Sequence, residues 1–487
     1  MLRLTPSLLL LLSLLSAPLA AQASAEAVRA DAALDRALET ISADELRSDL
    51  YFLASDEMAG RDSPSVEQRI AARYIQARLQ RLGFQPGAPG DSYLYEWSAP
   101  QVGLDKARTG LTMRTAEGTE RELVWAEDYF LAPRSPGMRE VSGEVLWWGV
   151  FDDAEVDAAQ VRGKWLLGES DGGVPRGLQR ALLAAGATGI LVLPAQDAQQ
   201  SVADALGSIA ERYEKPRLSG RAQTSAGFPV VYLAEGPGAW MRSMLPVDGE
   251  RGTALGVAAD ERCGYGPLDD AVLENVIGIW PGSDPELAKE LIILSAHYDH
   301  VGVGNDGAIY NGADDNGSGT SGMLAIAEAL TEYGPMRRSV MLMWVSAEEK
   351  GLLGSRAWTL DPYLPDGLVP LCNINIDMIG RNAPDSLGIT PTRDHAAYSA
   401  LTKAAEAHAA AEGFGPLKNA DAYWSRSDHA NFSRNLDIPV AFLFTDVHED
   451  YHQPSDTPDK IDYDKMRRVC RLVMRMLHDL QIDQPEF

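Results

Sequence analysis

The sequence contains no histidine before position 297, and all eight histidines lie between His297 and His478. Any chemistry that needs an imidazole is therefore confined to the C-terminal half of the 487 residues. Cysteine is also scarce, because only Cys263, Cys372 and Cys470 are present and no CxxC pair exists to hold a metal. Cys372 opens an apolar segment and Cys470 lies on the apolar stripe of a helix, so buried, unpaired thiols are weighed against one disulfide with a free thiol.

The sequence has few Lys and Arg residues relative to Asp and Glu. The chain has 43 Lys and Arg residues against 70 Asp and Glu residues, which gives a formal net charge of -27 at pH 7. A strongly negative chain repels nucleic acid and anionic lipid, so we expect neither as a partner. The excess of acid indicates either a well-solvated surface or an acidic cleft that attracts cationic amino termini. Neither interpretation determines an oligomeric state.

The sequence lacks a hydrophobic run that would cross a bilayer comfortably. Its Leu-rich stretch, residues 8–15, is far shorter than the roughly 20 residues of a membrane-spanning helix. Arg3 precedes this stretch and the small residues 21–25 follow it, which is the pattern of a cleaved secretory signal. We predict a signal peptide over residues 1–25, export to the periplasm or the extracellular space, and no stable membrane insertion after cleavage. An uncleaved N-terminal anchor is the alternative.

A chain of this length is expected to form more than one domain. Residues 43–82 have helical apolar spacing and Gly83 is a stop signal, whereas residues 102–251 hold short β-like runs around one helix at 176–187. From residue 291 onward, strand-like and helix-like segments alternate. The predicted division is a signal peptide at 1–25, the first part of the main domain at 26–100, an inserted domain at 101–255 and the rest of the main domain at 256–487.

The C-terminal half carries continuous apolar runs that are typical of strands covered on both faces. They occupy residues 291–294, 340–345, 374–376 and 440–444, and helical patterns follow at 319–333 and 465–480. The fold class predicted from this alternation is α/β: a sandwich with a central mixed, largely parallel sheet covered by helices, plus a smaller β-rich inserted domain. In such sheets, ligands collect beyond the carboxyl ends of the strands.

Acids and imidazoles occur at the ends of these strands or in tight turns between them. Two imidazoles and three carboxylates form the ligand set of a paired divalent-metal site, and one further carboxylate is left to handle a proton. Each segment alone is also compatible with an ordinary turn or helix cap. The segments are Ser295–His300, Gly312–Gly317, Ala347–Gly351, Asn375–Met378 and Tyr451–Pro454.

Local context gives several of these residues a role. Asp299, two residues after His297, is placed to accept the second ring N–H and fix the tautomer. The adjacent acids Asp314 and Asp315 stand in a glycine-rich turn that opens a helix, where a cation would relieve their repulsion. Asp377 ends a buried strand and needs a partner, for which a metal and Arg381 are both candidates.

Taken in order, the motifs SAHYDH, GADDNGSG, SAEEKGLLGS, NIDMIG, SDHANF and YHQPSDT resemble the co-catalytic di-zinc peptidase family of bacterial leucyl aminopeptidases and glutamate carboxypeptidase. The similarity covers residues 42–85, with the motif LASDEMAGR, and then about 274–480. The segment between them resembles the protease-associated domain that is often inserted in this family. The domains at 26–100 and 256–487 are accordingly interpreted as the two parts of a peptidase domain.

The resemblance implies two Zn²⁺ per chain and assigns the site residue by residue. His297, Asp314 and Asp377 would surround one zinc, and Asp314 would bridge to a second zinc held by Glu349 and His452. Glu348 would be the general base, with Asp299 behind His297. Tyr451 matches a tyrosine that polarises the substrate carbonyl in some members, and a packing role is the alternative. The metal ligands are thus His297, Asp314, Glu349, Asp377 and His452.

The function predicted is a secreted zinc-dependent aminopeptidase that hydrolyses N-terminal residues from peptides through a metal-bridging hydroxide, with Glu348 as base. Its substrates would be peptides with a free N-terminus. A carboxypeptidase or dipeptidase of the same family is the first alternative. A non-catalytic binding protein on the same scaffold is the second, and loss of metal ligands would be its mark.

Overall fold

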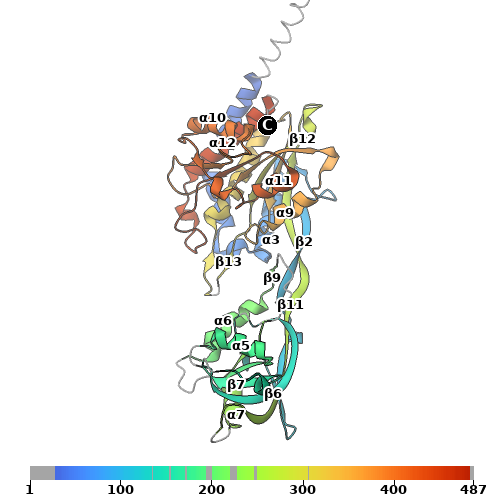
Figure 1. Cartoon of the computed structure of the whole chain (residues 1–487). Coiled ribbons are helices and arrows are strands. Elements are labelled where there is room, and N and C mark those ends of the chain that lie inside the picture. The colour runs from blue at the N-terminus through green and yellow to red at the C-terminus, as the bar shows by residue number, and fades with distance from the viewer. Residues whose placement is uncertain are drawn as a thin grey trace, which may run out of the picture. The chain divides into compact units, whose positions relative to one another are not determined.

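The computed structural model (Figure 1) describes residues 28–482 except 134, 136, 153–154, 171–172, 194–199, 220–226, 246–248 and 305. The predicted signal peptide lies outside these residues. The chain forms two compact units, one made of Met1–Ser98 with Val272–Phe487 and the other of Ala99–Ala271. Strands β2 (Leu94–Leu104) and β11 (Thr253–Trp280) carry the chain from one unit to the other.

The first unit is built on a mixed sheet whose middle strands are parallel. β12 pairs in parallel with β15 and β16, and β16 pairs in parallel with β19. Antiparallel pairings of β11 with β15 and of β17 with β19 extend the sheet on both sides. The strand order is β1 (Gln85–Pro86), β11, β15 (Ser339–Val345), β12 (Glu290–His297), β16 (Val369–Ile376), β19 (Val440–Phe444), β17 (Gly388–Thr390) and β18 (Lys418–Asn419).

Both faces of this sheet are buried, as the continuous apolar runs predicted. Successive side chains of a strand point to opposite faces, so Ile292 and Leu294 of β12 join one apolar cluster while Leu291 and Ile293 join the other. The predicted α/β class with a largely parallel sheet is confirmed. Helices α2 (Ala43–Leu53), α3 (Val66–Leu82), α8 (Gly319–Tyr333), α10 (Ala400–His408) and α12 (Tyr463–Ile482) contribute to the first cluster, and α9 (Leu353–Leu360) and α11 (His429–Leu436) to the second.

The N-terminal helical region is not one continuous helix. α2 ends at Leu53, a short 3-10 turn covers Asp56–Arg61, and α3 begins only after Pro64. Proline lacks a backbone N–H and its ring clashes with the preceding turn, so a helix cannot pass through this position. α3 then ends at Gly83, which has a φ of 79° and lies in the left-handed region that favours glycine.

The second unit has its own sheet, ordered β4, β3, β11, β6, β7, β8, β10, β5. The boundary of this unit falls at Ala271, later than residue 255, because β11 runs without a break for 28 residues. The protease-associated identity of the segment stays a prediction. The elements are β3 (Gly110–Thr115), β4 (Glu120–Leu123), β5 (Tyr129–Leu131), β6 (Met138–Val150), β7 (Trp165–Glu169), β8 (Gly189–Leu193), β9 (Arg217–Leu218), β10 (Val230–Leu233), α4 (Ala158–Val161), α5 (Arg176–Ala185), α6 (Val202–Glu214) and α7 (Glu235–Arg242).

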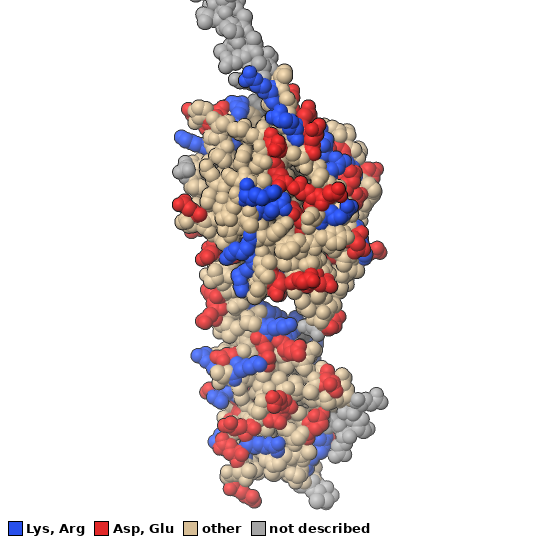
Figure 2. Space-filling model, turned by 180° about the vertical axis from the view of Figure 1, so that it is seen from behind, with Lys and Arg blue, Asp and Glu red and all other residues tan. Residues whose placement is uncertain are grey.

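The surface charges, the cysteines and the helix lengths can be compared with the sequence predictions. Figure 2 shows acidic and basic side chains interspersed over the face seen there, in spite of the excess of acid in the sequence. Cys263, Cys372 and Cys470 are all buried and unpaired. Among the described residues, no helix is both long enough and apolar enough to span a bilayer.

Candidate metal centre

The predicted motifs meet at the carboxyl ends of the parallel strands in the first unit. His297 is the last residue of β12 and lies in register with Val345, the last residue of β15. Glu348 and Glu349 follow β15, and Asp377 directly follows β16. Parallel strands end at the same edge of a sheet, so segments separated by up to about 150 positions converge there.

One group of metal-ligating atoms comes from His297, Asp315 and Asp377. His297 Nε2 lies 3.3 Å from Asp315 Oδ1 and 3.3 Å from Asp377 Oδ1. The Ser427 hydroxyl donates to the other oxygen of Asp377 at 2.7 Å and so fixes the orientation of the carboxylate. His297 is 1% exposed and Asp377 is 7% exposed. This group is a buried set of one imidazole and two carboxylates.

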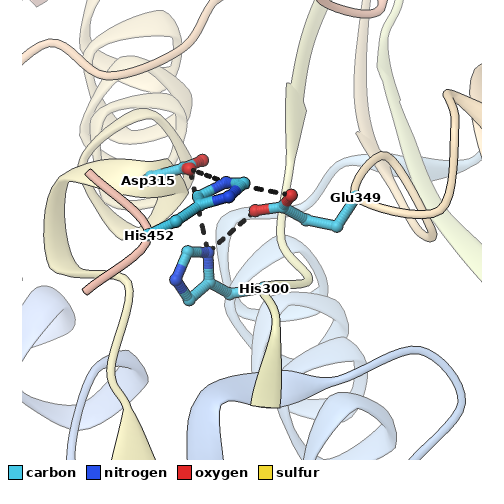
Figure 3. A group of neighbouring side chains, drawn as sticks. All are labelled: His300, Asp315, Glu349 and His452. Carbon is cyan, nitrogen blue, oxygen red and sulfur yellow. Dashed lines mark hydrogen bonds and ion pairs between the residues drawn. The ribbon is translucent and has the colours of Figure 1, made fainter. Parts of the chain in front are cut away.

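A second group consists of His300, Asp315, Glu349 and His452, as Figure 3 shows. His452 Nε2 lies 3.0 Å from Asp315 Oδ2 and 3.2 Å from Glu349 Oε2. His300 Nδ1 lies 2.9 Å from Glu349 Oε1. Asp315 therefore belongs to both groups and offers a different oxygen to each, which is the geometry of a bridging carboxylate.

Asp314, which the sequence interpretation placed at the bridge, is in neither group. Its Oδ1 accepts the Gly380 N–H at 2.7 Å, and its Oδ2 faces His448 Nε2 at 3.3 Å. The two neighbouring side chains leave the turn in different directions, so only Asp315 reaches His297 and His452. The geometry therefore moves the bridging role from Asp314 to Asp315.

The turn that presents Asp315 is held by a residue far along the chain. The buried Asp456 carboxylate accepts the backbone N–H groups of Asp314, at 3.0 and 3.1 Å, and of Asp315, at 3.2 Å. Burial and the nearby Asp314 carboxylate raise the pKa of Asp456 to about 6. Nothing in the local sequence links these residues, and the sequence interpretation did not identify Asp456.

The main chain and the side chain of Asp299 make different contacts, and its predicted role behind His297 stays a prediction. His297 Nδ1 is 3.1 Å from the Asp299 backbone carbonyl but 3.7 Å from its carboxylate, so the main chain fixes the ring. The Asp299 carboxylate instead accepts the backbone N–H of Glu348 at 3.1 Å. Asp299 thus links the turn after β12 to the turn after β15.

Glu348 lines the pocket at the centre but belongs to neither ligand group. Burial raises the pKa of the Glu348 carboxyl well above its usual range, and the carboxylates of Asp428, Glu349 and Asp377 raise it further against the opposing effect of His297. A carboxyl with a raised pKa beside a set of ligands is suited to exchanging a proton. This is the arrangement expected of a general base.

A buried arginine neutralises part of this acidic centre. Arg61 is 1% exposed and donates to the carbonyl oxygens of Leu53, Tyr298, Asn311 and Gly312. Burial lowers its pKa to about 10, although nearby carboxylates favour the charged form. The sequence interpretation quoted the motif that contains Arg61 without giving the residue a role. The only signal in the sequence was the presence of an arginine in that motif.

The pocket has a volume of about 40 Å³, and its lining residues are of two kinds. Asp315, Glu348, Glu349 and Asp377 form the acidic wall. The remaining lining residues are largely apolar or aromatic, with Arg426 the cation among them: Met378, Tyr423, Arg426, Phe442, Phe444, Val447 and Tyr451. The Tyr451 ring stacks on His452 with centroids 4.0 Å apart, and burial raises the pKa of its hydroxyl.

The donor set fits divalent metal ions. Zinc bonds to nitrogen and oxygen are about 2.0 to 2.2 Å long, so tetrahedral neighbours stand about 3.3 Å apart, close to the separations observed here. His452 Nε2 lies near two carboxylate oxygens but has no hydrogen-bond geometry with either, as expected for an atom aimed at a shared ion. Nitrogen and carboxylate donors together are typical of zinc.

Residues 275–477 match peptidase family M28. The M28 region contains every segment described above that contributes to the two ligand groups, from β12 to His452. The preceding 28–98 part of the same unit lies outside the matched residues.

Curated relatives of the M28 region carry aminopeptidase names. A probable leucine aminopeptidase of Arthroderma otae is 30% identical over 210 residues, which cover 40% of this chain and 56% of the relative. Aminopeptidase YwaD of Bacillus subtilis is 25% identical over 271 residues, which cover 54% of this chain and 53% of the relative. The chain thus spans about half the length of the curated relatives it matches.

Solved structures support the fold over a greater length. A zinc aminopeptidase from Bacillus subtilis matches with a TM-score of 0.51 and 20% identity, covering 90% of this chain and 95% of that structure. An aminopeptidase from Aneurinibacillus sp. strain AM-1 matches with a TM-score of 0.50 and 21% identity, covering 92% and 95%. At these identities the likeness concerns the fold.

Proposed function

We propose that this protein is a zinc-dependent aminopeptidase that removes N-terminal residues from peptides. The observation that carries this proposal is the pair of ligand groups that share Asp315, with Glu348 beside them but outside both. The aminopeptidase names of the curated relatives point to the same activity. No ligand position of the two groups is filled by a residue unable to bind metal, which argues against a non-catalytic binding protein.

Two zinc ions would be held by two ligand sets that share one carboxylate. His297, Asp315 and Asp377 would hold one ion, and Asp315, Glu349 and His452 the other. Bound zinc supplies a Lewis acid and makes an activated water available at neutral pH. The protein would contribute the fixed positions of the donors, through Ser427 behind Asp377 and Asp456 behind Asp315.

Glu348 would move the proton in this reaction. Its raised pKa allows the carboxylate to accept a proton from the attacking water and then to deliver it to the departing amine. The Tyr451 hydroxyl, which lines the same pocket, would donate a hydrogen bond to the oxyanion that develops on the substrate carbonyl. Asp299 would keep Glu348 in place through the backbone N–H.

The pocket also suggests the direction of substrate binding. A cationic α-amino group is attracted by the acidic wall of Asp315, Glu348, Glu349 and Asp377. The apolar lining residues, among them Phe442 and Phe444, favour an apolar side chain at the cleaved residue. We therefore expect peptides with a free, apolar N-terminal residue to be preferred.

The Glu348→Gln variant tests the proposal. Glutamine keeps the shape of the side chain but cannot accept the proton, so kcat should fall by about 10²- to 10⁴-fold. Aminoacyl anilides and N-acetylated analogues should be assayed in parallel, with zinc content measured on the same samples. Two zinc ions per chain in both proteins, with activity lost only in the variant, is the expected result. Full activity of Glu348→Gln would refute the proton-transfer role.

Arg426 makes a carboxypeptidase the second candidate. It is the cation among the pocket-lining residues, and a guanidinium is suited to binding a substrate carboxylate. Hydrolysis of N-acetylated peptides from the carboxyl end, abolished in Arg426→Gln, would favour this alternative. Release of free amino acids only from unblocked peptides would favour the aminopeptidase.

We further propose that the protein is exported to the periplasm or the extracellular space. The basis is the signal-like pattern of residues 1–25 in the sequence. N-terminal sequencing of the protein recovered from outside the cytoplasm should begin close to residue 26. A mature protein that retains residues 1–25 would contradict this.

A further inference from the structure

We infer that His300 Nδ1 is a fourth protein ligand of the zinc ion assigned to Asp315, Glu349 and His452. This inference rests on the proposed two-zinc function and adds a donor that the sequence motifs did not supply. It makes the two metal sites unequal, with four protein ligands at one and three at the other.

The donor atoms of this site surround a common space (Figure 3). Glu349 offers Oε1 toward His300, at 2.9 Å, and Oε2 toward His452, at 3.2 Å. Asp315 Oδ2 is 3.0 Å from His452 Nε2 and 3.9 Å from His300 Nδ1. These separations bracket the distance of about 3.3 Å between neighbouring donors around tetrahedral zinc. Both imidazoles therefore approach the same two carboxylates from different sides.

The position of His300 is fixed by its surroundings. The side chain is fully buried, and its backbone N–H donates to the Arg61 carbonyl at 3.3 Å. Gly312 has a φ of 60°, and a Cβ added there would lie 2.4 Å from the His300 ring. The turn that leads to Asp315 thus leaves room for this imidazole only because residue 312 is a glycine.

Only one nitrogen of the His300 ring makes polar contacts with the described residues. His300 Nε2 has no hydrogen-bond partner among the described residues, so Nδ1 makes the polar contacts of the side chain. Four protein donors complete the coordination typical of a closed zinc site, whereas three donors at His297, Asp315 and Asp377 leave a position open for substrate. We expect the four-ligand site to fill first and to hold its zinc more tightly.

Metal binding distinguishes a ligand from a group that only hydrogen-bonds to Glu349. In His300→Asn, the amide N–H can still donate to Glu349, but the nitrogen that binds zinc is gone; His300→Ala removes both. If His300 is a ligand, both variants should lose the tighter zinc affinity by more than about 100-fold, beyond the range seen when a group that only orients a ligand is removed. His408→Asn is the matched control, because His408 Nε2 pairs with Asp479 at 2.7 Å outside the site.

The measurement is a zinc titration of metal-free full-length protein against a chromophoric chelator, followed by X-ray absorption of the sample with one zinc per chain. We expect two imidazoles around that zinc in the unmodified protein and one in His300→Asn. One imidazole around that zinc in the unmodified protein, or recovery of affinity in His300→Asn relative to His300→Ala, would overturn the inference alone. Binding of fewer than two zinc ions by the unmodified protein would instead overturn the proposed function.

Discussion

Asp314 and Asp315 are chemically alike and adjacent, yet they contact different groups: Asp314 faces His448 and lies in neither ligand group. Asp315 faces imidazoles on both sides, at His297 and His452, whereas Asp314 accepts a backbone N–H from Gly380. A buried carboxylate needs donors or a cation to offset the cost of its desolvation. Asp314 receives a donor from the protein, while Asp315 depends on the groups at the metal centre.

The pair gives a direct test at the scale of single residues. Asp315→Asn should weaken the binding of both zinc ions by more than about 100-fold, beyond the range seen when a group that merely orients a ligand is removed. Asp314→Asn keeps an oxygen for the Gly380 N–H and should retain both ions. Zinc content after dialysis against a weak chelator checks this. Equal retention of zinc by both variants would exclude Asp315 as the bridge.

The helices that cover the sheet carry a group of charges away from the metal centre. Glu45 of α2 lies 3.7 Å from Arg78 of α3, and Arg78 also pairs with Asp49 and with Glu328 of α8. Burial and the nearby Glu328 raise the pKa of Glu45 to about 7. The contact between these helices therefore includes a carboxyl that prefers to be protonated.

This contact predicts a pH-dependent stability. The folded protein binds a proton at Glu45 between about pH 4.5 and pH 7, where the unfolded chain does not, so this group lowers stability as pH rises through that window. Glu45→Gln should raise the free energy of unfolding by on the order of 1 kcal/mol at pH 8, after allowance for solvent screening, and change it little at pH 4.5. Urea unfolding at the two pH values measures the difference. Glu39→Gln, at an exposed position, is the control, and a gain in Glu45→Gln that is the same at both pH values would contradict the assignment.

Secondary structure was predictable where burial dominates. The apolar runs at 340–345 and 440–444 correspond to β15 and β19. Strands that are buried on both faces are continuously apolar, so the sequence pattern identifies them directly. The helical region at 43–82 was predicted as one piece, but the chain leaves the helix after Leu53 and α3 begins only at Val66. The 28-residue length of β11 was not predictable, since one strand runs across the boundary between the two units.

At the scale of the whole molecule, two units with separate cores share one chain. Leu167 and Trp165 of β7 belong to a core of the second unit, whereas the metal centre lies entirely in the first. A ligand that binds only the folded form stabilises the unit that binds it. Metal binding should therefore act on the first unit.

Calorimetry of the full chain should show this separation. Removal of zinc with a chelator should lower the melting temperature of one transition and leave a second transition unchanged. Leu167→Ala, which removes buried side-chain volume worth about 2 to 5 kcal/mol, should lower only that second transition. Equal shifts of both transitions on removal of zinc would show that the two units unfold together.

The sequence by itself determined the α/β class, the order of the ligand-bearing segments and the chemical types of the donors. It did so because strand burial and turn chemistry are local properties. The tertiary structure decided which of two adjacent acids lies in both ligand groups, and it brought His300 to the centre. The reason is physical: the orientation of the turn at Asp315 is set by Asp456, about 140 residues away, and by the ends of parallel strands that meet only in the folded sheet.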